Sequence, residues 1–186
     1  MIDVHLIGAN PGVALFESED DALPVAYASA WRVDWSIAGA GDVLITWFEG
    51  VPQAVSEVPK LAEWLAGKFN RHFPEVSGLV WPDPKIVVAP VRYECDLTSG
   101  AHIEAAGVTV DITQPLTSRF VNVGSFPLGA ESLGLSTLIS PCRQGSIAVG
   151  GAKLPGSPRI QQDAVASSAF LANAEVWYQH DGDHRT

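Results

Sequence analysis

One segment of this sequence, residues 56–73, has the spacing of an amphipathic helix, and this constrains the fold more than any other feature. Its apolar side chains recur every three or four residues, so they form one stripe that can pack on a sheet. The stripe consists of Val58, Leu61, Ala62, Leu65 and Phe69. Ser56 is the expected N-cap, Pro59 suits the first turn, and Pro74 ends the segment. The sequence therefore predicts one main helix, over about residues 56–73, packed on a sheet.

Most of the remaining sequence consists of short apolar segments separated by Gly and Pro. In residues 32–38, Val33, Trp35 and Ile37 alternate with polar side chains, which predicts a half-buried strand. Residues 43–49 are more uniformly apolar and follow a Gly-rich turn, so the two segments predict a hairpin. Further strands are expected within residues 2–7, 78–81, 85–97, 102–113, 116–123, 136–140, 145–150 and 167–180.

The order of these segments indicates the fold class. The sequence shows neither an internal repeat nor a second helical segment that would indicate alternating strands and helices. We therefore expect an α+β fold, a mostly antiparallel β-sandwich or open barrel with one main helix. Residues 1–186 are expected to form a single domain, with long loops at about 8–24 and 150–160 and a polar C-terminal tail at 180–186.

The composition bears on association. A chain of 186 residues can bury a sizeable core, yet only 17% of its residues are charged while 47% are hydrophobic. A single domain with so few charges must expose many neutral or apolar side chains, and contacts with other subunits commonly cover such surfaces. This composition predicts a homo-oligomer that also contacts other structural subunits.

The charge and the start of the chain exclude some partners. The net charge is −10, and no Lys or Arg precedes Arg32, which argues against specific binding to a phosphate backbone. An acidic surface remains compatible with DNA passing nearby. The N-terminal residues lack the features of a signal peptide, and no apolar run approaches the length of a membrane span. We therefore expect a location in a virion or the host cytoplasm, without secretion through a signal peptide and without a membrane.

The motifs of common cofactor and metal sites are missing from the sequence. The Gly-rich residues 145–159 lack the spacing of a phosphate-binding loop, and the acidic residues 17–21 lack the pattern of a calcium-binding loop. Carboxylates flank Cys95, and no recognisable base signature accompanies Cys142, so neither thiol has the setting of a nucleophile. No cofactor and no metal are expected.

The best candidate for chemistry is a predicted hairpin that begins at Arg92. A three-residue turn, residues 98–100, would place Asp96 opposite His102 and Glu94 opposite Glu104. Cys95 would point inward with its apolar neighbours. The change of parity further along the chain predicts a β-bulge near residue 107.

This polar face has two interpretations. If the protein is an enzyme, Asp96 and His102 are the acid–base pair, and Glu94 or Glu104 assists them, with or without a divalent metal. Alternatively the face is a water-exposed ladder or a subunit contact, with no catalytic residue. The sequence favours the second interpretation.

The expected architecture is similar to that of ring-forming proteins of tailed phages, which combine a β-sandwich or barrel with a flanking helix. The resemblance implies a non-catalytic structural subunit of a homo-oligomeric assembly, such as a tail-tube, terminator, connector or capsid-associated component of a virion. Two alternatives remain open. One is a small cytosolic enzyme that uses the hairpin at residues 92–104. The other is a small-ligand-binding β-barrel lined by some of Trp31, Trp35, Trp47, Trp81 and Trp177.

Overall fold

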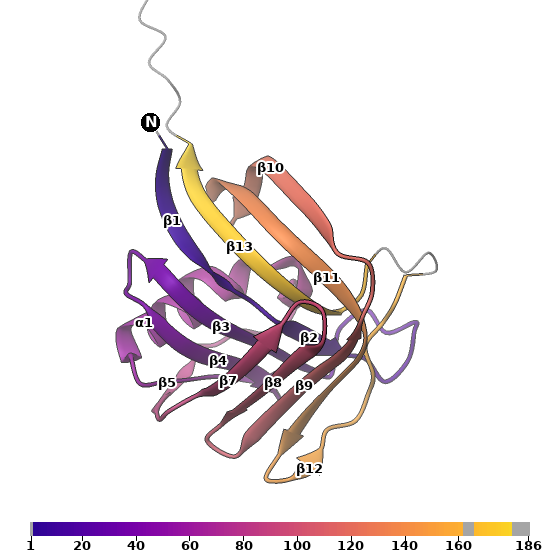
Figure 1. Cartoon of the computed structure of the whole chain (residues 1–186). Helices are drawn as coiled ribbons and strands as arrows, with labels where there is room; N and C mark the ends of the chain where they lie inside the picture. The colour runs from indigo at the N-terminus through magenta and orange to yellow at the C-terminus, as the bar shows by residue number, and fades with distance from the viewer. Residues whose placement is uncertain (1, 162–165, 180–186) are drawn as a thin grey trace, which may run out of the picture.

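A curved β-sheet dominates the computed structural model, which describes residues 2–161 and 166–179 (Figure 1). Within these residues the sheet has 13 strands, and its main path runs β6-β5-β4-β3-β1-β13-β11-β9-β8-β7. The strands before the helix are β1 (Ile2–Ala9), β2 (Gly12–Leu15), β3 (Ala26–Ser36), β4 (Gly41–Phe48) and β5 (Val51–Ser56). Those after it are β6 (Lys85–Val88), β7 (Arg92–Asp96), β8 (Gly100–Ala105), β9 (Val108–Pro115), β10 (Arg119–Leu128), β11 (Glu131–Val149), β12 (Ala152–Lys153) and β13 (Ala169–Gln179). The α+β prediction, an open barrel or sandwich with one main helix, is confirmed.

The expected helix is present, but its geometry changes along its length. It begins as α1 (Pro59–Trp64), continues as the π-helical η1 (Leu65–Phe69) and ends in the 3₁₀ segments η2 (Asn70–His72) and η3 (Pro74–Val76). The stripe predicted from the spacing is buried, as the burial of Leu61, Leu65 and Phe69 shows. Ser56 is not its N-cap: it belongs to β5, where its hydroxyl donates to the carbonyl of Asp42 and accepts the Val58 N–H. The helix lies in the chain between β5 and β6, which pair in parallel. Two parallel neighbours need a long crossover connection, and the helix is part of it.

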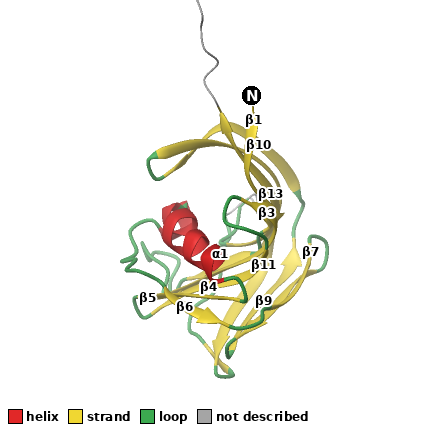
Figure 2. Cartoon of the chain, turned by 90° about the vertical axis from the view of Figure 1, so that its left-hand side faces the viewer, coloured by secondary structure: helices red, strands yellow, loops and turns green. Residues whose placement is uncertain are grey.

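The sheet buries both of its faces around β4. Val43 and Ile45 pack against the helix, whereas Leu44 between them packs against the strands β7, β8 and β9. A strand covered on both sides reads as a continuous apolar run, which explains the uniform character of residues 43–49. Figure 2 shows the helix inside the curve of the sheet. The fold therefore has a helical layer and one strongly curved sheet, whose β7–β9 part covers the face of β4 that is turned away from the helix.

Two expectations for β3 meet different outcomes. The hairpin is confirmed, because β3 pairs with β4 from Ala26 opposite Phe48 to Val33 opposite Gly41. The prediction that Val33, Trp35 and Ile37 share one buried face is wrong. An irregularity at Asp34, where the pairing of β1 with β3 shifts, leaves Val33 buried and turns Trp35 outward.

Several boundaries also differ from those predicted. The loop expected over residues 8–24 contains the end of β1 and all of β2, and the one expected over 150–160 contains β12. Residues 78–81 form no strand. The segments 136–140 and 145–150 belong to one strand, β11, which pairs first with β13 and then with β9. The strand expected within residues 167–180 is confirmed as β13. Its alternate side chains from Phe170 to Val176 face the helix side.

The predicted polar tail, residues 180–186, lies outside the described residues. In the described part of the chain, no helix has both the length and the apolar character needed to cross a membrane.

Candidate functional site

The predicted hairpin forms, but its register differs by two residues from the expected one. Asp96 pairs with Gly100, Cys95 with Ala101 and Glu94 with His102. The turn therefore consists of residues 97–99, and Leu97 belongs to the turn instead of the strand. Gly100 has a positive φ of 140°, and a Cβ there would lie 2.5 Å from the carbonyl oxygen of the neighbouring strand β9, so only glycine fits.

Asp96 is consequently a turn residue rather than the partner of His102. Its Oδ1 atom accepts hydrogen bonds from the backbone N–H and hydroxyl groups of Thr98 and Ser99. These bonds hold the pKa of Asp96 below its ordinary value, because they stabilise the ionised form. The expected Asp96–His102 pair does not exist.

His102 instead contacts two other carboxylates. Its Nδ1 atom lies 2.6 Å from Oδ1 of Asp111 on β9, and its Nε2 atom lies 3.2 Å from Oε1 of Glu104. The hydrogen bond to Asp111 raises the pKa of His102 above 6.5, and Glu104 adds to the rise. Arg92 bridges Glu94 and Glu104 at 2.9 and 3.5 Å, so a cation lies between these two carboxylates.

The β8–β9 connection explains why the sequence did not reveal Asp111. No bulge occurs near Gly107. Ala106 and Gly107, with φ values of 47° and 80°, form a two-residue turn that places Ala105 opposite Val108. Because the turn has two residues, Ala105 and Val108 lie on the same face, so the alternation continues inward without a bulge. The same pairing brings Asp111 opposite His102.

The resulting polar face is open to solvent. The side chains of His102, Glu104 and Asp111 are 35%, 45% and 46% exposed. His102 and Asp111 also line a broad, shallow depression. Such a surface can bind and release a proton. It does not surround a substrate or exclude water from a reacting group, which acid–base catalysis commonly requires.

Neither cysteine is activated. Burial raises the pKa of the Cys142 thiol to about 11, with a smaller contribution from Cys95. Burial also raises the pKa of Cys95, which packs partly against the core that lies between β4 and the β7–β9 part of the sheet. A reactive cysteine needs the opposite shift, so neither thiol has the setting of a nucleophile.

A second candidate site is a cavity between the end of the helix and the sheet. Its volume is about 150 Å³, and its lining is mainly apolar. Five aromatic side chains from distant parts of the sequence contribute to it: Trp31, Phe69, Phe73, Phe126 and Phe170. The polar residues of the lining are Asn10, Glu75 and Thr137. Of the tryptophans considered for a ligand barrel, Trp31 lines this cavity, whereas Trp35 is exposed on the outside.

The sequence contained little local signal for this cavity. Phe69 was expected on the helix and Phe170 on its strand, but their meeting depends on strand order and on the curvature of the sheet. Glu75 follows the helix terminator Pro74 and has no distinguishing pattern around it. Only the density of aromatic residues at the end of the helical segment pointed to this region.

A third feature is an apolar area on the outer face of the sheet, away from the helix. We call it the outer patch; it consists of Ile7, Trp35, Phe120 and Leu138. Phe120 pairs with Leu138, and Ile7 pairs with Trp35. Phe120 is 67% exposed and Trp35 is 47% exposed, while Ile7, Phe120 and Leu138 line one shallow depression with several charged residues.

Within residues 2–161 and 166–179, no group of three or more His, Cys, Asp or Glu side chains is arranged to hold a metal ion. The chain matches no protein-family model, and comparisons with curated proteins and with solved structures give no significant match.

Proposed function

We propose that this protein is a non-catalytic structural subunit of a homo-oligomeric assembly, and most concretely a component of a tailed-phage virion. The observation that carries the proposal is the outer patch. Large apolar side chains seldom cluster on the exposed face of a sheet unless another protein surface covers them. Phe120 and Trp35 are of the aromatic type enriched at the centres of interfaces.

The surroundings of the outer patch favour a second copy of the chain as the partner. Arg32, Asp34 and Glu175 line the same depression as three of the patch residues. Arg32 already pairs with Asp42 of its own subunit at 2.9 Å, but its side chain is still 48% exposed. In a twofold-symmetric contact each surface meets its own copy, so this guanidinium can also approach an acidic residue of the other subunit. The mixture of charges thus allows the patch to be self-complementary.

The edge of the sheet offers a further route to assembly. In the described residues β10 pairs with β11 and with no other strand, which leaves its outer edge open. Open edges expose backbone groups that can pair with another chain. The net charge of −10 fits an assembly past which DNA moves without binding. The choice among tail tube, terminator, connector and capsid-associated protein rests on the architectural resemblance alone.

Native mass spectrometry and negative-stain electron microscopy of the purified protein test this proposal. We expect a discrete oligomer or a ring, and we expect Phe120→Asp to shift the population towards monomer because it places a charge in the contact. Val80→Asp is the matched control, since Val80 is 75% exposed but lies outside the outer patch. Monomeric wild-type protein at micromolar concentration, or equal behaviour of the two variants, would overturn the proposal.

A further inference from the structure

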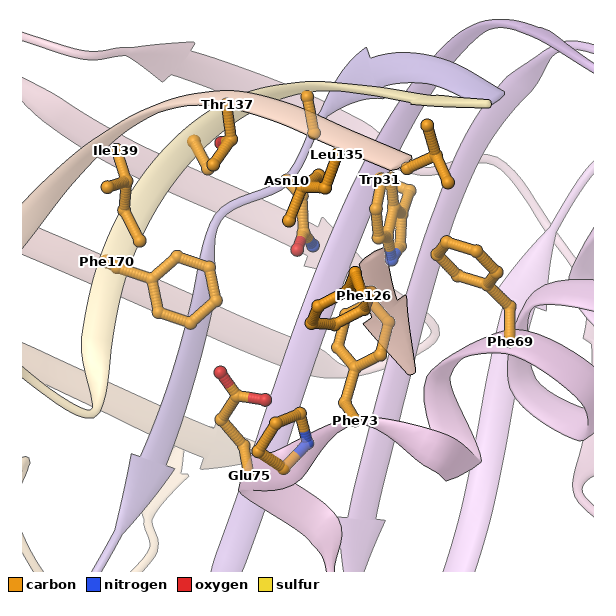
Figure 3. Close-up of a pocket in the computed structure, with 14 residues that line it drawn as sticks. Asn10, Trp31, Phe69, Phe73, Glu75, Phe126, Leu135, Thr137, Ile139 and Phe170 are labelled. Carbon is orange, nitrogen blue, oxygen red and sulfur yellow. The ribbon is translucent and has the colours of Figure 1, made fainter. Parts of the chain in front are cut away.

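The cavity beside the end of the helix is the strongest remaining feature of the molecule. It lies between η1 and η3 on one side and β3, β10, β11 and β13 on the other. Figure 3 shows the side chains that line it. Its volume of about 150 Å³ matches that of an engineered protein cavity that binds benzene, so a benzene-sized molecule fits. Ala172, Ala174 and Val176 keep the β13 side of the cavity small and apolar.

The carboxylate of Glu75 is the unusual group in this lining. Figure 3 shows it pointing from η3 towards the sheet, beside the rings of Phe73 and Phe170. Its Oε2 atom is enclosed and accepts no hydrogen bond from any described residue. The residue as a whole is half-buried, and its own backbone N–H stabilises the carboxyl group. The enclosed Oε2 atom is costly nevertheless, because it has lost water and gained no compensating donor.

The other polar groups around the cavity do not supply that donor. The amide of Asn10 donates to the carbonyls of Pro11 and Ala30 and to the hydroxyl of Ser29. No ion pair to Glu75 occurs in the described part of the chain, and burial raises the pKa of Glu75. A cationic donor that enters the cavity would therefore favour the ionised form of Glu75 and supply the hydrogen bond that Oε2 lacks.

We propose that this cavity binds a small organic amine, whose ammonium group pairs with Glu75 and whose apolar body contacts the surrounding aromatic rings. Two independent observations point to this chemistry. The enclosed carboxylate offers an ion pair and a hydrogen bond to a cationic donor. The faces of aromatic rings also attract organic cations, and five aromatic side chains line the same space.

The cavity should bind small carboxylates and neutral hydrocarbons less tightly than amines. A small carboxylate would place a second negative charge beside Glu75, and a neutral hydrocarbon would leave Oε2 without a donor. Both can occupy the cavity only with lower affinity than an amine of the same shape. This site is separate from the outer patch, so its occupancy does not depend on the proposed assembly.

Three ligands of similar size test this assignment: benzylamine, toluene and benzoate. Binding is followed at neutral pH by isothermal titration calorimetry and by the NMR signal of the Trp31 indole N–H, which reports on the cavity wall. We expect benzylamine to bind at least about tenfold more tightly than toluene, and benzoate to bind more weakly than either.

Variants separate the charge from the shape. Glu75→Gln keeps the size of the side chain and removes its charge, so it should abolish the preference for benzylamine and leave toluene binding unchanged. Ala174→Leu fills the cavity and should weaken both ligands. Glu63→Gln, at an exposed position on α1, is the matched control and should bind like the wild type.

Circular dichroism of each variant establishes that it is folded before binding is measured. Equal affinity of the wild type for benzylamine and toluene would overturn the proposal. So would a Glu75→Gln variant that retains the preference, or wild-type protein in which millimolar benzylamine produces no saturable change at Trp31.

Discussion

At the scale of single residues, Asn70 links the helix to the sheet. Its side chain is fully buried in η2. The Nε1–H group of Trp31 donates to Oδ1 of Asn70 at 2.9 Å, and Nδ2 of Asn70 donates to the hydroxyl of Tyr27 at 2.8 Å. Both partners lie on β3, so these two bonds fix the end of the helix beside the cavity.

Removal of this amide should therefore be costly. We expect Asn70→Ala to lower the free energy of unfolding by about 2–4 kcal/mol, because it leaves the Trp31 and Tyr27 groups unsatisfied in a buried space. Urea denaturation measures the change. Asn122→Ala, at an exposed position on β10, is the control and should change stability by less than about 0.5 kcal/mol. A small effect at Asn70 would mean that water replaces the amide.

The hairpin face makes a prediction about pH. The pKa of His102 in the folded protein is raised above 6.5, chiefly by the hydrogen bond to Asp111. Its stabilising contribution is therefore complete below pH 6.5 and is lost as the pH rises through the folded value. An NMR titration should place the His102 pKa above 6.5, and Asp111→Asn should lower it, whereas Asp34→Asn should leave it unchanged. A titration at or below 6.5 in the wild type would contradict this account.

The same face shows what alternation can and cannot predict. The two-residue period was sufficient to group Arg92, Glu94, His102 and Glu104 on one side of the hairpin. It could not identify their partners, because the register depends on whether Leu97 belongs to the strand or to the turn. That choice follows from the hydrogen bonds of Asp96 in the turn and from the tight packing of Gly100 against β9. Neither is a property of the local pattern.

At the scale of elements, β11 accounts for much of the curvature. The sequence divided it into two strands because Pro141 and Gly145 interrupt the apolar pattern. In the structure, Pro141 is the last residue paired with β13, and Cys142 is the first paired with β9. The proline therefore lies where the strand changes partners, where the loss of one N–H donor is tolerated.

Two glycines in regular elements should respond to alanine in opposite directions. At Gly134 on β11, a Cβ would lie 2.1 Å from the ring of Trp177, which crosses the strand there. At Gly67 in η1, a Cβ would meet only Pro84, at 4.0 Å. We expect Gly134→Ala to destabilise the protein by about 1–3 kcal/mol through this overlap.

Gly67→Ala should stabilise the protein by about 0.5–1 kcal/mol, because alanine favours a helix. Thermal or urea unfolding of both variants measures the two effects, and each serves as the other's control. A destabilised Gly67→Ala variant would show that the π-helical turn requires glycine. The sequence predicted this helix and its buried stripe, but it gave no indication of the change from α to π geometry.

At the scale of the whole molecule, strand order is the part that the sequence could not supply. The chain places β1 between β3 and β13, and it places β11 between β13 and β9. These pairings connect residues far apart in sequence, such as Ile7 with Glu175, and alternation within a strand carries no information about its neighbour. The cavity and the outer patch both arise from this order, so neither followed from the motifs.

Glu75 at the cavity should lower the free energy of unfolding of the whole molecule at neutral pH. Burial raises the pKa of Glu75 above its ordinary value of 4.5, so the folded protein binds this proton more tightly than the unfolded chain does. Stability linked to this group is therefore greatest at low pH and decreases as the pH rises from about 4.5 through the folded value. Glu75→Gln should remove this loss.

We accordingly expect Glu75→Gln to be more stable than the wild type at neutral pH, with the difference shrinking as the pH falls to about 4. Urea denaturation at the two pH values measures it, and Glu63→Gln should match the wild type at both. Saturating benzylamine should then stabilise the wild type more than Glu75→Gln at neutral pH, because a ligand that binds only the folded state raises its stability. If Glu75→Gln were instead less stable at neutral pH, the carboxylate would have a stabilising partner within the protein, and the cavity would have no unopposed charge for an amine to neutralise.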